Sequence, residues 1–195
     1  MTTNRLFAAL LVALAGFAPA AHAGLIGTTI TLEYDYIGVP STVEAIPVTD
    51  GIEVTCTGGG TGNAAVCAFL TAGTQTLDIR DSSIVYAYSG PAAAFDPVQF
   101  SGFRFLDLAP GFAIANVALS TDIAGLDMSR IAFSTISVTM NMSALPVGPG
   151  SSGFALQLLP VPEPSAALLM LCGLGGLALR LRRQPLSSTR RISLP

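Results

Sequence analysis

The chain has 195 residues, of which 51% are hydrophobic, and its net charge of −3 comes from nine arginines and twelve acidic residues, with no lysine. The segment 24–160 alone carries a charge of −8, and the single histidine lies before it, at position 22. With no basic patch to contact phosphates, nucleic acid is excluded as a partner. The lack of histidine after position 22 excludes a Ser-His-Asp or Cys-His catalytic site and an imidazole-ligated metal site.

Residues 1–23 have the three parts of a secretory signal peptide. Arg5 supplies the positive charge, residues 6–17 are apolar, and Ala21 and Ala23 form an A-x-A cleavage site. The apolar run is too short to span a bilayer. We therefore expect export through the Sec translocon and cleavage by signal peptidase before Gly24.

The segment 24–160 is long enough for one passenger domain with a hydrophobic core. In 29–36 apolar and polar residues alternate, which predicts a strand with one buried and one solvated face. Asp50 and Gly51 form a hairpin signal between strands expected at 43–48 and 52–56. Further strands are predicted at 65–70, 76–80, 84–88, 98–106, 112–119, 131–142 and 154–159. This spacing predicts an all-β fold, an antiparallel β-sandwich or jelly roll.

Cys56 and Cys67 are the only cysteines of the passenger domain, and a glycine-rich loop separates them. In an exported protein such a pair is expected to form a disulfide, which for a loop of this length stabilises by about 3 kcal/mol. A two-thiol metal site is the alternative, but neither a C-x-x-C spacing nor a histidine supports it. We predict a disulfide and no cofactor.

Glu33 and Asp35 lie two residues apart and therefore on one face of their predicted strand. With Glu44 or Glu53 on a neighbouring strand, their oxygens are suited to bind Ca²⁺. A carboxylate pair also suffices for glycoside hydrolysis, which needs no histidine. The simplest interpretation is a solvated strand face whose charges oppose edge-to-edge aggregation, with no metal site and no catalytic residue.

Tyr86 and Tyr88 lie two apart on another predicted strand. If they faced solvent, their rings would be able to stack on sugars. The chain has four tyrosines and no tryptophan, the residue best suited to that stacking. We therefore expect both tyrosines to pack in the core.

The segment 161–183 consists of three parts in sequence. The first is Val161-Pro162-Glu163-Pro164-Ser165, whose prolines stop any upstream helix because they fix φ and lack a backbone donor. The second, 166–179, carries no charge. The third is an arginine cluster formed by Arg180, Arg182 and Arg183.

A helix over 165–183 would span roughly 28 Å, against about 30 Å for the hydrocarbon core of a bilayer. A buried core helix is the alternative, but the run has no polar stripe and its three glycines weaken it as a soluble helix. The positive-inside rule places the arginines in the cytoplasm. We predict a single transmembrane helix and a cytoplasmic basic tail at 184–195.

These three parts, in this order, resemble the PEP-CTERM sorting signal of Gram-negative bacteria that produce exopolysaccharide. The resemblance covers residues 161–183. It implies recognition by an exosortase, a membrane-embedded cysteine transpeptidase-like enzyme, with removal of the tail and delivery to the cell surface or extracellular matrix. The chain departs from the usual pattern in having Cys172 inside the apolar run and a longer extension, 184–195, after the arginines.

Together these features predict a non-enzymatic exported protein. We expect an inner-membrane-anchored precursor that becomes a cell-surface or matrix protein, associated with extracellular polysaccharide and biofilm. A carbohydrate- or calcium-binding β-sandwich module is the alternative function. A carboxylate-based glycoside hydrolase is the third.

The cleavage site generates the first prediction. The mature protein is expected to begin at Gly24, because the A-x-A motif ends at Ala23 after an apolar run of signal-peptide length. Intact-mass and N-terminal peptide mass spectrometry of the exported protein will show this terminus. Exported protein that keeps Met1 would contradict the assignment.

Overall fold

The computed structural model describes residues 24–36, 39–108, 113–161 and 172–176. The chain divides into two units, Met1–Pro160 and Val161–Pro195. The first is built from antiparallel β-strands with few helical turns, as the sequence predicts. The predicted signal peptide and most of the predicted transmembrane helix lie outside the described residues. Within the described residues, no helix is long and apolar enough to cross a membrane.

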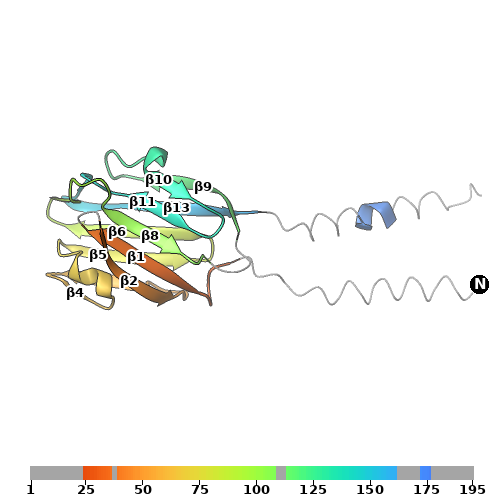
Figure 1. Cartoon of the computed structure of the whole chain (residues 1–195), viewed down its shortest axis with the longest axis horizontal. Helices are drawn as coiled ribbons and strands as arrows, with labels where there is room; N and C mark the ends of the chain where they lie inside the picture. Colours follow the sequence, from red (N-terminus) through yellow and green to blue (C-terminus); the bar gives the residue numbers. More distant parts are fainter. Residues whose placement is uncertain (1–23, 37–38, 109–112, 162–171, 177–195) are drawn as a thin grey trace, which may run out of the picture. The chain divides into compact units, whose positions relative to one another are not determined.

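The described residues form a five-stranded sheet in the order β10-β11-β8-β1-β2 (Figure 1). Leu32 lies opposite Phe105 and Tyr34 opposite Phe103, and all four side chains are buried. Because side chains alternate along a strand, these residues define the inward face of the sheet. The strands are β1 (Thr29–Tyr36), β2 (Val39–Pro47), β8 (Gly102–Leu106), β10 (Ile131–Phe133) and β11 (Val138–Asn141).

A second sheet of the described domain has six strands in the order β4-β3-β5-β6-β13-β9. At its centre Phe154 lies opposite Tyr86 and Leu156 opposite Ile84, and these side chains are also buried. The strands are β3 (Val54–Gly58), β4 (Thr61–Gly62), β5 (Thr74–Arg80), β6 (Ser83–Gly90), β9 (Ile114–Thr121) and β13 (Gly150–Pro160). A short pair joins β7 (Ala93–Ala94) to β12 (Pro146–Val147).

The inward faces of the two sheets meet in an aromatic core, so the domain is sandwich-like. Phe103 of the five-stranded sheet packs on Tyr86 of the six-stranded sheet, with ring centroids 5.6 Å apart. On its other side Phe103 packs on Tyr34 at 5.1 Å. Burying a side chain of this size stabilises the fold by about 1.5–3 kcal/mol. The alternation read from the sequence in 29–36 is therefore confirmed on β1, where Tyr34 faces the core.

Three of the predicted elements are wrong. The hairpin expected at Asp50 and Gly51 does not form, because β2 and β3 belong to different sheets and the segment between them crosses from one to the other. The backbone there bonds elsewhere: Val48 N donates to Thr28 O at 2.8 Å. The strand expected at 65–70 is the 3-10 helix η1 (Ala65–Ala68). The long strand expected at 131–142 is split into β10 and β11.

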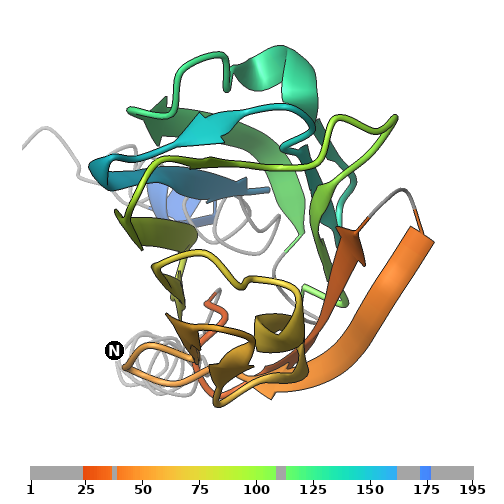
Figure 2. The ribbon, with the colours of Figure 1, turned by 90° about the vertical axis from the view of Figure 1, so that its left-hand side faces the viewer.

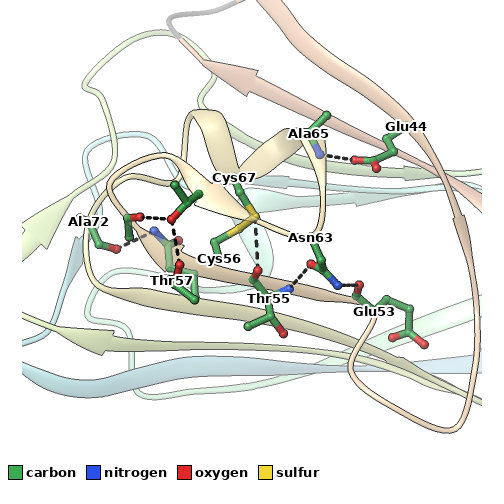
Figure 3. Close-up of a disulfide and its surroundings, with 12 residues drawn as sticks. Glu44, Glu53, Thr55, Cys56, Thr57, Asn63, Ala65, Cys67 and Ala72 are labelled. Carbon is green, nitrogen blue, oxygen red and sulfur yellow. Dashed lines mark hydrogen bonds between the residues drawn. A yellow bond between two sulfur atoms is a disulfide. The ribbon is translucent and has the colours of Figure 1, made fainter.

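The predicted disulfide between Cys56 on β3 and Cys67 on η1 is confirmed (Figure 3). It ties η1 to the edge of the six-stranded sheet. At Gly62 a Cβ atom would lie 2.3 Å from the Cys67 Sγ, so this close approach requires glycine. The neighbouring Asn63 side chain accepts from Thr55 N at 2.7 Å and donates to Glu53 O at 2.9 Å.

The bridge generates the second prediction. Replacing Cys56 and Cys67 together by alanine is expected to lower the free energy of unfolding by about 2–4 kcal/mol, because the unfolded chain regains the freedom of the closed loop. Urea unfolding followed by circular dichroism will measure the loss. The matched control is Cys172→Ala, which leaves the bridge intact. A double variant as stable as the wild type would contradict the role given to the bridge.

Candidate functional site

The two acids expected to share a face of β1, Glu33 and Asp35, both bind the same arginine. Arg104 lies directly opposite Glu33 on β8. Its Nη1 is 2.6 Å from Glu33 Oε1, and its Nη2 is 2.7 Å from Asp35 Oδ2. The guanidinium also lies over the ring of Phe100, 4.6 Å from the centroid. The carboxylate pair therefore has a counterion already, and a metal ion would have to displace it.

Asp35 does not lie on a solvated face, so that part of the strand prediction is wrong. It lies opposite Gly102, next to the buried Ser101, and only 1% of its side chain is exposed. No described donor bonds its second carboxylate oxygen, Oδ1. Burial raises the pKa of Asp35 above its ordinary value, and the opposing charge of Arg104 only partly offsets this. The residue is a buried structural acid.

Glu44 and Glu53, the possible third ligands, bind backbone N–H groups instead. The Glu44 carboxylate accepts from Ala65 N at 2.7 Å, at the first residue of η1 (Figure 3). The Glu53 carboxylate accepts from Thr49 N at 2.8 Å and from Ile79 N at 2.7 Å. Among the described residues, no three His, Cys, Asp or Glu side chains form a group able to hold a metal ion. The structure brings Glu33 and Asp35 together but leaves Glu44 and Glu53 in separate places.

The described domain has a cleft of about 450 Å³, within the range of roughly 300–1,000 Å³ typical of small-molecule sites. Both sheets contribute to it: Tyr34 and Tyr36 lie at the end of β1, Gln75 near the start of β5, and Tyr88 near the end of β6. Figure 2 views the domain from this end. The aromatic lining consists of Tyr34, Tyr36, Phe69, Tyr86, Tyr88 and Phe95.

Hydrogen bonds fix the inner wall of the cleft. The Tyr86 hydroxyl donates to Gln75 Oε1 at 2.7 Å, and Gln75 Nε2 donates to Ala72 O at 2.9 Å. The Tyr88 hydroxyl donates to Pro91 O. Both tyrosines are buried, which confirms the expected core packing, yet their rings also line the cleft. Alternation along a strand does not distinguish a core side chain from one in the wall of a cleft.

Two glycines leave the space that the Tyr88 ring occupies. Gly73 and Gly148 both have positive φ, of 56° and 71°. A Cβ atom at either position would come within 3.0 Å of the ring. Such a contact is tighter than packed atoms tolerate, and a side chain at this φ would be strained. The wall is therefore built around one position of this ring.

Asp96 is the one acid among the residues that line the cleft. It is half-buried, and no described donor bonds its carboxylate, although its main-chain oxygen accepts from Val98 N at 2.9 Å. Burial raises the pKa of Tyr34, and the nearby negative charge of Asp96 raises it further. Burial likewise raises the pKa of Tyr86. Neither phenol ionises at neutral pH, so Asp96 supplies the charge of the cleft.

Sequence reasoning singled out Tyr86 and Tyr88 but missed Phe69, Gln75 and Asp96. Asp96 lies in a loop, where no periodicity marks it, and Phe69 lies in a turn after η1, within the segment that was wrongly expected to be a strand. The available signal was a general one, since binding residues often lie on loops and Asp96 lies in one. No known protein family, curated protein or solved structure matches this chain.

The ion pairs of Arg104 with Glu33 and Asp35 generate the third prediction. Arg104→Met is expected to lower the free energy of unfolding at neutral pH by about 3 kcal/mol, because it leaves Asp35 as a buried, uncompensated charge. Asp35 has a raised pKa, so its contribution to stability is largest below the pKa of the unfolded state and falls as pH rises through its folded pKa. The loss in the variant should therefore grow with rising pH.

Urea unfolding of the wild type, Arg104→Met and Arg104→Met/Asp35→Asn across mildly acidic to neutral pH will test this dependence. The double variant should recover stability at neutral pH because it carries no buried charge at position 35. A loss in Arg104→Met that does not vary with pH would show that the arginine acts by packing on Phe100 alone.

Proposed function

We propose that this chain is a non-enzymatic exported protein, sorted by a C-terminal PEP-CTERM signal to the cell surface or extracellular matrix and associated there with exopolysaccharide. The observation that carries the proposal is the tripartite segment 161–183. It follows the last strand of the domain without a linker: β13 ends at Pro160 and the signal begins at Val161. The division of the chain into units falls at the same place.

The disulfide supports export. Bridges of this kind form and persist in oxidising compartments and are rare in the cytosol. Cys56 and Cys67 are both buried in the bridge, so it belongs to the folded core rather than to a redox site at the surface. This agrees with a signal peptide at 1–23, Sec-dependent translocation and cleavage by signal peptidase.

The surroundings of the acidic residues favour a binding or structural role over catalysis. Glycoside hydrolysis needs two carboxyl groups about 5–10 Å apart with room for a sugar between them. Between Glu33 and Asp35 the space is taken by the Arg104 guanidinium. Asp96 has no second acid beside it in the lining of the cleft. The passenger is therefore proposed to act as a surface or matrix component.

Processing would take place at the membrane. In the proposal a helix over 165–183 anchors the precursor, with the arginines Arg180, Arg182 and Arg183 on the cytoplasmic side. The exosortase then recognises Pro162, Glu163 and Pro164 and removes the tail. The passenger is thereby released or attached at the surface, where extracellular polysaccharide is its proposed neighbour.

The fourth prediction tests the signal through Glu163. Glu163→Gln keeps the size of the residue and both flanking prolines, and it eases contact with a membrane. A pocket built for the carboxylate would lose about 2–5 kcal/mol of binding, because its own charged group is left unpaired. In cells with an active exosortase we expect uncleaved, membrane-bound precursor to accumulate, as seen by immunoblotting of membrane and surface fractions.

The matched control is Glu163→Asp, which keeps the charge and is expected to be processed in part. Wild-type protein should appear as a shorter, released or surface-attached form. Wild-type protein that retains residues 166–195 in such cells would show that the segment is an ordinary membrane anchor.

A further inference from the structure

The charged side chain that lines the cleft is an acid, Asp96. Asp96 is half-buried, and its carboxylate is unpaired within the described part of the chain. No arginine lines the cleft, and the chain has no lysine. A carboxylate that is partly removed from water without a counterion is unfavourable. The group that would compensate it is a cation, supplied from outside the protein.

The remaining lining is aromatic. Tyr36 and Phe69 are half-buried and lie with ring centroids 5.7 Å apart, and Tyr34 lies 6.4 Å from Phe69. On the inner side Tyr86 and Phe95 lie 6.5 Å apart. Aromatic rings attract a cation placed over their faces, by about 0.5–2 kcal/mol for each desolvated contact. A cleft lined by aromatic rings and one carboxylate is suited to an ammonium group that also carries carbon.

Other ligand classes fit less well. An anion would meet Asp96 and no positive side chain of the cleft. A Ca²⁺ ion takes six to eight oxygen ligands, and the cleft offers one carboxylate. A purely apolar ligand would bury Asp96 without any partner. From these contacts we propose that the cleft binds a small organic cation, with its ammonium group beside Asp96 and among the rings of Tyr34, Tyr36 and Phe69.

The wall that faces this position is preorganised. The bonds from Tyr86 to Gln75 and from Gln75 to Ala72 hold the amide in one orientation. The Tyr88 ring fits closely against Gly73 and Gly148, where a side chain would have no room. A rigid wall lowers the entropy lost on binding. This inference does not depend on the sorting proposal, since it concerns only the residues of the passenger domain.

Binding is measurable directly because the four tyrosines of the chain all line the cleft and the chain has no tryptophan. Intrinsic tyrosine fluorescence therefore reports on this site alone. The full-length protein, in a polyoxyethylene ether detergent that contains no sugar, is titrated with glucosamine and with choline chloride. Glucose and N-acetylglucosamine serve as the uncharged counterparts. Saturable fluorescence changes are expected with one or both cations and not with the two neutral sugars.

The two cations distinguish the source of the ligand. Binding of glucosamine alone indicates an amino sugar, such as a deacetylated unit of a polysaccharide. Binding of choline indicates a quaternary ammonium group. The glucosamine signal should vanish when pH is raised above the pKa of its amine, while a choline signal should persist. The raised pKa of Tyr34 and Tyr86 keeps these phenols protonated over that change.

Two variants connect binding to the named residues. Asp96→Asn is expected to weaken binding at least tenfold, and Tyr36→Leu by about three- to tenfold. The matched control is Asp81→Asn, which removes the same charge at the β5–β6 turn, at the opposite end of these strands from the cleft. Circular dichroism spectra and melting temperatures will show that each variant is folded, and either cleft variant alone suffices if the other is not.

Three outcomes would overturn the proposal. One is the absence of a saturable change with both cations. Another is equal binding of glucose or N-acetylglucosamine, which would show that charge is not recognised. The third is an equal loss of binding in Asp96→Asn and Asp81→Asn, which would show that only the net charge of the domain attracts the cation.

Discussion

The packing of Phe103 between the two sheets is the contact on which the rest of the domain depends. This ring is fully buried and touches Tyr34 on its own sheet and Tyr86 on the facing sheet. Antiparallel sheets gain little stability unless one face is covered, so the sandwich exists only while this aromatic layer is closed. Two of these three rings, Tyr34 and Tyr86, also line the cleft. Phe103 does not line it but packs on both of them. Core and cleft are consequently one packed unit.

Most of the buried polar groups discussed above have a partner inside the domain. Gln75 and Tyr86 bond to each other inside the wall, as buried polar groups must. Asp35 has Arg104 as its partner, yet burial still raises the pKa of Asp35 above its ordinary value. Asp96 differs from both, because no described side chain neutralises it. Among the described residues that line the cleft, Asp96 is the one acid, and no arginine lies beside it there.

The sequence predicted what depends on local periodicity and missed what depends on distant partners. Alternation located β1 and placed Ile30 and Leu32 in the core, because the direction of a side chain in a strand follows from its position. Alternation could not locate the 3-10 helix η1, because its first backbone N–H donates to Glu44, which lies on the distant strand β2. The connection near Asp50 was also not predictable. A turn sequence such as Asp50-Gly51 does not determine whether the next strand pairs with the preceding one or joins another sheet.

The candidate site was hidden for the same reason. The backbone N–H of Phe95 bonds to Leu145 O, a residue fifty positions further along the chain, and this bond fixes the loop that carries Asp96. Tyr34 and Tyr86 were visible as strand residues, but their meeting across the sandwich depends on how the two sheets stack. The disulfide was predictable because Cys56 and Cys67 had no competing partner in the passenger domain.

β13 runs from the cleft end of the described domain to the end where the domain's last strand finishes. Its first residue, Gly150, pairs with Gly90, beside the cleft, and its last, Pro160, pairs near Ile114 where the passenger domain ends. Between them β13 is bonded to β6 on one side and β9 on the other. Ladder hydrogen bonds run perpendicular to the strands, so a pull applied at Pro160 along β13 would load many of them together. A domain attached there would hold its cleft at the end away from the attachment point.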